Sequence, residues 1–120
     1  MKRRLLSILT AVALVFGLGA AVAVYRTQSA TAATVGATGP ITGYEGLCLD
    51  DRSASTALFN PIQVYTCNDT GAQVWEPQSD GALYNPQSGK CLDDTGYGGS
   101  GTQVQIWACA DTSNQQWNVP

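Results

Sequence analysis

The chain has 120 residues, and its six basic side chains stand against nine acidic ones, which gives a formal net charge of −3. This length allows one small domain. Four of the basic residues fall within the first 26 positions, so the rest of the chain keeps only Arg52 and Lys90. Two cations cannot neutralise a phosphate backbone or an anionic lipid surface, so we expect neither nucleic acid nor membrane as a partner of the mature chain. The charge does not exclude a neutral ligand.

Residues 1–33 are predicted to be a secretory signal peptide. A basic start is followed by an uncharged, mostly apolar run over residues 5–24 and by small residues at 29–33 of the kind that signal peptidase recognises. The apolar run approaches the roughly 20 residues that span a bilayer, so an uncleaved membrane anchor is the alternative. Both interpretations place the remainder outside the cytoplasm. We therefore expect a secreted, extracellular protein in which residues 34–40 form a short linker.

The cysteines all lie in the exported part of the chain, and they are Cys48, Cys67, Cys91 and Cys109. An even number outside the cell predicts two disulfides, for which four cysteines allow three connectivities. Zinc is disfavoured, because the chain has no histidine and none of the closely spaced cysteine pairs of zinc sites. We expect neither a metal nor another cofactor.

An internal duplication fills residues 41–120. Three blocks recur in the same order at offsets of 43, 42 and 42 residues: 47–51 with 90–94, 62–67 with 104–109, and 73–75 with 115–117. The sequence therefore predicts repeat one over 41–80 and repeat two over 81–120. Since each copy carries two cysteines, the simplest pairing is within copies, Cys48–Cys67 and Cys91–Cys109.

The exported part is predicted to be all-β. Its apolar segments are short, rich in β-branched and aromatic residues, and separated by turn residues such as those at 80–81, 85–86 and 95–101. No helical period of any length occurs after the signal peptide. In the strand expected at 104–108, alternation puts Gln105 and Trp107 on the face of Cys109.

Each repeat is expected to form a hairpin held by its disulfide. If Cys91 lies directly opposite Cys109, then Asp93 faces Trp107, and the same register in repeat one puts Asp50 opposite Tyr65. Opposed side chains have Cβ atoms about 4.5–5.5 Å apart. These residues are expected on the outward face. A carboxylate beside an aromatic ring, with an amide nearby, suits a sugar, which offers hydroxyl groups and an apolar C–H face.

The three blocks, read as Cys-Leu-Asp, Gln-x-aromatic-x-Cys and Gln-x-Trp, resemble one repeat of the ricin B-chain lectin family. The resemblance covers about residues 41–120 and implies a β-trefoil with a shallow sugar pocket in each repeat. The family has three repeats and this chain has two, so the expected trefoil is incomplete. Either the chain is a fragment of a longer product, or chains self-associate to complete the trefoil.

The resemblance also implies the sugar-binding residues. In repeat two they are Asp93, Gln105, Trp107, Asn114 and Gln115, and in repeat one they are Asp50, Gln63, Tyr65 and Gln73. Ala72 stands where the family has asparagine, so the first site lacks one amide. The resemblance places Trp75 and Trp117 in the core. The ligands it implies are galactose-type sugars or a plant polysaccharide such as xylan, and the sequence does not choose between them.

The predicted function is carbohydrate binding without catalysis. Each repeat carries an Asp-Asp pair, but neighbouring residues of a strand point to opposite faces, and no histidine or free cysteine is expected to act in their place. Two alternatives are an accessory module of a larger secreted glycoside hydrolase and a protein-binding trefoil of the inhibitor type. Sugar binding without turnover on a glycan array separates the lectin from an enzyme and from the protein-binding trefoil.

Overall fold

The computed structural model describes residues 34–118, so the predicted signal peptide lies outside the described residues. As predicted, this part of the chain is built from short strands, here joined by single turns of 3-10 helix. In chain order the elements are η2 (Tyr44–Gly46), β1 (Cys48–Asp51), η3 (Arg52–Ala54), β2 (Ile62–Tyr65), η4 (Gly71–Gln73), β3 (Glu76–Pro77), β4 (Leu83–Asn85), β5 (Lys90–Asp94), η5 (Thr95–Tyr97), β6 (Val104–Trp107) and η6 (Ser113–Gln115). None of the helices within 34–118 is long and apolar enough to cross a membrane.

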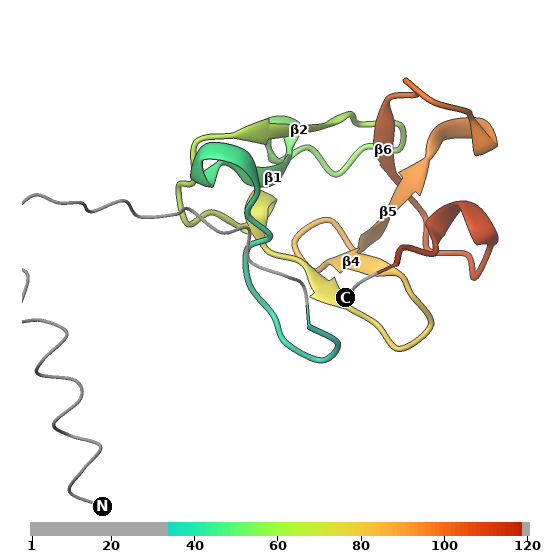
Figure 1. Cartoon of the computed structure of the whole chain (residues 1–120), viewed down its shortest axis with the longest axis horizontal. Coiled ribbons are helices and arrows are strands. Elements are labelled where there is room, and N and C mark those ends of the chain that lie inside the picture. The colour runs from blue at the N-terminus through green and yellow to red at the C-terminus, as the bar shows by residue number, and fades with distance from the viewer. Residues whose placement is uncertain (1–33, 119–120) are drawn as a thin grey trace, which may run out of the picture.

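The strands form two antiparallel sheets. One is the hairpin β1–β2, and the other has the order β3–β4–β5–β6. The hairpins β1–β2 and β5–β6 lie side by side, with β3 and β4 below them (Figure 1). An isolated bridge between Pro61 and Gln105 joins the two hairpins.

The backbone bonds repeat with the sequence. The Trp75 amide donates to the Gly39 carbonyl at 2.9 Å, and the Trp117 amide donates to the Gly81 carbonyl at 2.8 Å. Gly39 therefore holds in repeat one the place that Gly81 holds in repeat two. The segment 34–40, expected to be a linker, thus contains a residue bonded into the first repeat.

The disulfides join cysteines within each repeat, as predicted. Cys48–Cys67 and Cys91–Cys109 both have Cα–Cα distances of 5.1 Å. The predicted register, however, is wrong by two residues. Cys91 lies opposite Trp107, because β6 ends there and Cys109 follows in the loop beyond the strand. The disulfide closes the hairpin past its last ladder pair.

The two-residue shift changes which side chains face each other. Asp93 lies opposite Gln105, not Trp107, and Asp50 lies opposite Gln63, not Tyr65. Since side chains alternate with a period of two, the shift keeps each residue on its predicted face of the sheet. The aromatic residue is therefore a diagonal neighbour of the carboxylate.

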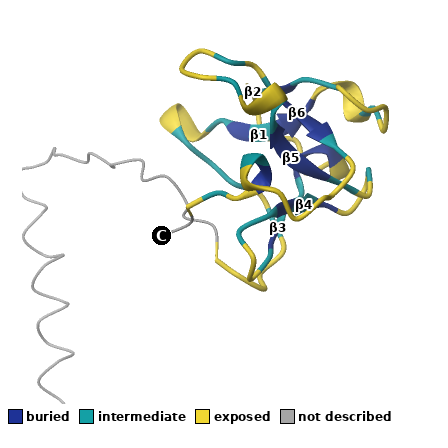
Figure 2. Ribbon diagram, turned by 90° about the vertical axis from the view of Figure 1, so that its right-hand side faces the viewer, coloured by how far each residue is buried: buried dark blue, intermediate teal, exposed yellow. Residues whose placement is uncertain are grey.

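A single apolar cluster lies between the hairpins and β4. Its buried members are Ile62, Trp75, Leu83, Leu92 and Ile106, and Trp117 packs against them while half-buried. Figure 2 shows this buried centre around β1, β5 and β6. The indole Nε1 of Trp75 donates to the Leu49 carbonyl at 3.0 Å, and that of Trp117 to the Leu92 carbonyl at 3.1 Å. Each tryptophan thus ties its repeat's first hairpin strand to the core.

The inner face of β2 is less covered than that of β6. Ile106 is fully buried, and its amide donates to the Asn60 carbonyl at 3.0 Å while its carbonyl accepts from the Phe59 amide at 3.2 Å. Val64 holds the matching position in repeat one and is 65% exposed. A segment of repeat one covers repeat two, whereas the corresponding side of β2 carries an exposed apolar side chain.

We expect Ile106→Ala to cost about 2–5 kcal/mol of unfolding free energy, because it empties a filled core position. Val64→Ala should change this free energy by less than about 0.5 kcal/mol, as is usual for a surface change. Urea titration of the protein measures both. An equally large loss for Val64→Ala, with a particle size in light scattering that grows with concentration, would show instead that β2 is covered in solution by self-association.

Candidate functional site

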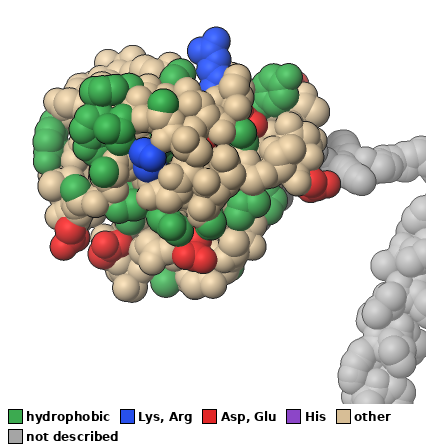
Figure 3. Space-filling model, turned by 180° about the vertical axis from the view of Figure 1, so that it is seen from behind, with side chains coloured by type: hydrophobic (Ala, Val, Ile, Leu, Met, Phe, Trp, Pro, Cys, Tyr) green, Lys and Arg blue, Asp and Glu red, His purple; other side chains and the backbone are tan. Residues whose placement is uncertain are grey.

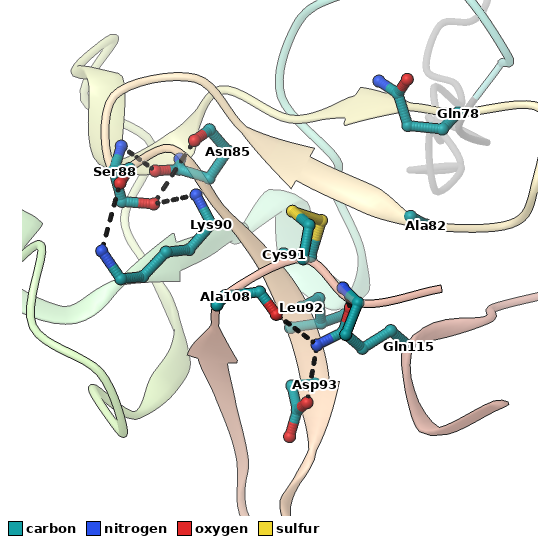
Figure 4. Close-up of a disulfide and its surroundings, with 12 residues drawn as sticks. Gln78, Ala82, Asn85, Ser88, Lys90, Cys91, Leu92, Asp93, Ala108 and Gln115 are labelled. Atoms are coloured by element: carbon teal, nitrogen blue, oxygen red, sulfur yellow. Dashed lines mark hydrogen bonds between the residues drawn. A yellow bond between two sulfur atoms is a disulfide. The ribbon is translucent and has the colours of Figure 1, made fainter. Parts of the chain in front are cut away.

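Each repeat holds a buried aspartate that accepts hydrogen bonds from two glutamines, Asp50 in repeat one and Asp93 in repeat two. Asp93 on β5 is 3% exposed. Its Oδ1 accepts from Gln105 Nε2 at 3.0 Å, and its Oδ2 accepts from Gln115 Nε2 at 2.9 Å. Figure 4 shows Gln115 reaching between Asp93 and the Ala108 carbonyl, next to the disulfide of Cys91. The carboxylate is thereby fixed from two sides.

Repeat one builds the same arrangement. Asp50 on β1 is 4% exposed. Its Oδ1 accepts from Gln63 Nε2 at 2.9 Å, and its Oδ2 accepts from Gln73 Nε2 at 2.7 Å. Gln73 is held in turn, since its Nε2 donates to the Thr66 carbonyl and its Oε1 accepts from the Asn68 amide. The structure thus joins Gln63 and Gln73 to Asp50 by hydrogen bonds, and Tyr65 lines the same cavity as Asp50 and Gln63.

The expectation that these aspartates lie on an outward, open face is wrong. The short helices η4 and η6 fold back over β1 and β5 and place their glutamines on the carboxylates. A buried carboxylate needs such donors, because burial without hydrogen bonds is costly. Gln73 and Gln115 therefore act first as supports of Asp50 and Asp93.

The two repeats differ at the residue before this glutamine. In repeat two, Asn114 Nδ2 donates to Asp93 Oδ2 and to the Asp94 carbonyl, both at 3.1 Å. Repeat one has the buried Ala72 at this position, which offers no such donor. Asp50 therefore has two side-chain donors where Asp93 has three.

The aromatic residues have different surroundings. Tyr65 is 52% exposed, whereas Trp107 is half-buried. The Trp107 ring meets the Phe59 ring edge-on, with centroids 4.5 Å apart and an interplanar angle of 63°. Phe59 comes from the loop of repeat one that covers Ile106. Sequence reasoning missed Phe59, because no feature within one repeat signals a contact between repeats.

A cavity of about 440 Å³ opens beside the repeat-one carboxylate. Three of its lining residues belong to the predicted sugar-binding set, Asp50, Gln63 and Tyr65, and a fourth is Ala72, which stands in place of the family's asparagine. Sequence reasoning missed the other lining residues, which are Arg52, Ser53, Ala54, Asn68 and Thr70. A smaller cavity of about 260 Å³ lies between the loop at 98–102 and η6, and its lining includes Asn114 and Trp117. Within residues 34–118, no group of three or more Cys, Asp or Glu side chains is placed to hold a metal ion.

The comparison with protein families decides the class of this fold and site. A family model described as a ricin-type beta-trefoil lectin domain matches residues 24–120. The chain belongs to the ricin-type β-trefoil lectin family. Both the trefoil fold and the resemblance drawn from the three sequence blocks are thereby confirmed.

Individual proteins agree with this assignment. The chain is 38% identical over 118 residues to serine protease 1 of Rarobacter faecitabidus, covering 64% of this chain and 22% of that protein. It is 37% identical over 71 residues to beta-galactoside-specific lectin 3 of Viscum album, covering 58% and 12%. A designed 3-fold symmetric protein, ThreeFoil, superposes with a TM-score of 0.66 at 25% identity, covering 73% of this chain and 68% of that one. The chain thus spans only 22% of the length of the protease and 12% of that of the Viscum album lectin.

Next to the site, Asp51 is buried without full hydrogen bonding. Its Oδ1 accepts from Asn60 Nδ2 at 2.7 Å, whereas its Oδ2 is buried with no partner among the described residues. Burial raises the pKa of Asp51 above its ordinary value, and the nearby charge of Asp50 adds to this. Asp51 and Asp50 are neighbours on β1, so their side chains point to opposite faces.

We expect Asp51→Asn to raise the unfolding free energy at neutral pH. The raised pKa means that the ionised carboxyl opposes folding above that pKa, and that stability returns as the pH falls through it. The advantage of the variant should therefore shrink in acid. Urea titrations at several pH values measure this, with Asp94→Asn, at the matching half-buried position of repeat two, as the control. An advantage that grows in acid would contradict the assigned cause.

We expect Asp93→Ala to destabilise the fold, because it leaves the amides of Gln105 and Gln115 buried without their acceptor. Each stranded group costs about 1–3 kcal/mol. The exposed Asp111→Ala should be neutral. Thermal unfolding followed by circular dichroism compares them. A stable Asp93→Ala variant would show that the amides find other partners.

Proposed function

We propose that this chain is a carbohydrate-binding module with one shallow sugar site in each repeat. The observation that carries the proposal is the cavity of repeat one, on which Asp50, Gln63 and Tyr65 all open. A carboxylate, an amide and an aromatic ring on one concave surface match the hydroxyls and the apolar face of a pyranose. Membership of a lectin family supports the same class of ligand.

The register of the hairpins favours this use. Directly opposed residues would press the ring against the carboxylate, whereas diagonal neighbours lie about 7–8 Å apart. Trp107 and Asp93 are diagonal neighbours, as are Tyr65 and Asp50. This separation leaves room for a sugar ring between the aromatic face and the carboxylate. Because glutamines hold the carboxylates, the sugar meets an acceptor that is already oriented.

We propose galactosides, or a plant polysaccharide such as xylan, as the ligand class. The name of the Viscum album relative, a beta-galactoside-specific lectin, supports the first. Repeat two carries the full set implied by the family: Asp93, Gln105, Trp107, Asn114 and Gln115. Repeat one carries Asp50, Gln63, Tyr65 and Gln73 without the asparagine. For neutral sugars we therefore propose that repeat two is the tighter site.

An accessory role in a larger secreted glycoside hydrolase is the second candidate. The similarity to serine protease 1, of which the matching segment is 22%, supports the part of this candidate that places the domain within a longer enzyme. In either role the domain binds sugar and does not cleave it. Incubation with xylan and galactan, followed by a reducing-end assay, tests this, and release of sugars would refute a purely binding role.

Asn114→Ala should weaken the binding of lactose or xylotetraose about two- to ten-fold, because the Asp93 carboxylate loses one of the three donors that orient it and such a bond is worth about 0.5–1.5 kcal/mol. The variant leaves Asp93 with the two glutamine donors that Asp50 has naturally, so the fold should survive. Binding to an immobilised, multivalent sugar makes weak sites visible.

The exposed Asp111→Ala, three residues earlier and outside both cavities, is the control. Unchanged binding in Asn114→Ala, combined with loss of all binding in Tyr65→Ala, would show that repeat one is the sugar site and repeat two is not. Loss of near-ultraviolet circular dichroism in either variant would identify misfolding instead.

A further inference from the structure

The cavity of repeat one differs from the matching surface of repeat two in its charge. At its rim, η3 begins with Arg52, where η5 in repeat two begins with Thr95. Residues 34–118 contain two basic side chains, Arg52 and Lys90, and basic groups lie apart on the face seen in Figure 3. One of these two cations therefore lines the larger cavity, in a domain that is otherwise acidic.

The side chain of Arg52 is not used by the fold. Its backbone is fixed, because its amide donates to the Pro61 carbonyl at 3.3 Å and its carbonyl accepts from Asn60 Nδ2 at 2.8 Å. Its guanidinium is exposed and has no hydrogen bond or ion pair with any residue in 34–118. In contrast, the Thr95 hydroxyl donates to the Gln103 carbonyl at 2.7 Å. Repeat two uses this position internally, and repeat one leaves it open to a ligand.

The same cavity is deepened by Ala72. In repeat two, the Asn114 side chain occupies the space between the Asp93 carboxylate and the Asp94 carbonyl. Ala72 leaves the matching space beside Asp50 unfilled, and it lines the cavity together with Arg52. The cavity is therefore lined by a buried acceptor, Asp50, and by an exposed permanent cation, Arg52.

We propose that the repeat-one cavity binds a uronic acid residue, a sugar that carries a carboxylate. Such a sugar offers vicinal hydroxyls, which donate to Asp50, and a carboxylate on the other side of its ring, which pairs with Arg52. Guanidinium and carboxylate groups form charged, often bidentate hydrogen bonds, which are stronger than neutral ones. Tyr65 covers the C–H face of the ring. The proposal rests on the proposed function of repeat one as a sugar site.

The test uses calorimetry to compare a neutral and an acidic ligand of equal length, galactotriose and trigalacturonate, on the secreted chain. We expect Arg52→Gln to lower the affinity for trigalacturonate about ten-fold or more. The ratio of the affinity for trigalacturonate to that for galactotriose should therefore fall. Arg52→Lys should recover part of the loss, because it restores charge without the planar fork. Sodium chloride should weaken trigalacturonate binding in the wild type more than in Arg52→Gln.

The matched control is Lys90→Gln, which removes the other cation of the described chain. If both charge variants lower trigalacturonate binding equally, the attraction is a property of net charge and the proposal is overturned. In a second outcome, galactotriose binding depends on Tyr65, but trigalacturonate binds no more tightly than galactotriose and its affinity is unchanged in Arg52→Gln. The acidic-sugar proposal then fails, and the proposed site for neutral sugars stands. If neither ligand responds to Tyr65→Ala, repeat one is not a sugar site, and the function proposed for that repeat fails.

Discussion

The bond between a buried aspartate and the glutamine of the Gln-x-Trp block is the interaction on which each repeat depends. Gln73 and Gln115 join a strand carboxylate to a backbone carbonyl some seven residues before them in the chain. The following tryptophan is set by the same turn, and Trp75 bonds back to the strand that carries Asp50. An anion in the interior must be met by donors, so the site and the core are stabilised by one set of contacts.

This shared support explains how the two repeats keep one skeleton and differ at the rim. The bonds of Gln73 to Asn68 and of Gln115 to Ala110 both measure 2.8 Å, although the residues around them differ. The position of Arg52 and Thr95 differs in this respect, because the Thr95 hydroxyl donates to the Gln103 carbonyl whereas the Arg52 guanidinium has no hydrogen bond within residues 34–118. Arg52 can therefore replace the threonine of repeat two, because the backbone at this position is fixed by its own hydrogen bonds and not by the side chain.

The sequence was sufficient for the parts of the structure that repeat. The short β-rich segments predict the all-β class, the duplication predicts the pairing of Cys91 with Cys109, and the family resemblance implies the grouping of Asp93 with Gln105 and Gln115. The register failed because the cysteines were assumed to be a ladder pair, whereas Cys109 lies past the end of β6. The expected exposure of Asp93 is wrong for a related reason. Strand alternation predicts the face on which a side chain lies, but not which segment folds over that face.

What the sequence could not reveal lies between the repeats. Phe59 reaches from repeat one to the ring of Trp107, and the neighbouring Asn60 bonds to the backbone of Ile106. The aromatic part of the second site is thus positioned by the first repeat, while Tyr65 is exposed on a strand whose Val64 is also exposed. In repeat two, the carboxylate and the amides come from that repeat, whereas the ring contact of Trp107 comes from Phe59 of repeat one. The two repeats differ in ring environment even where their hydrogen-bonding residues agree, so the packing, together with Ala72 and Arg52, supports the proposal that they bind sugar unequally.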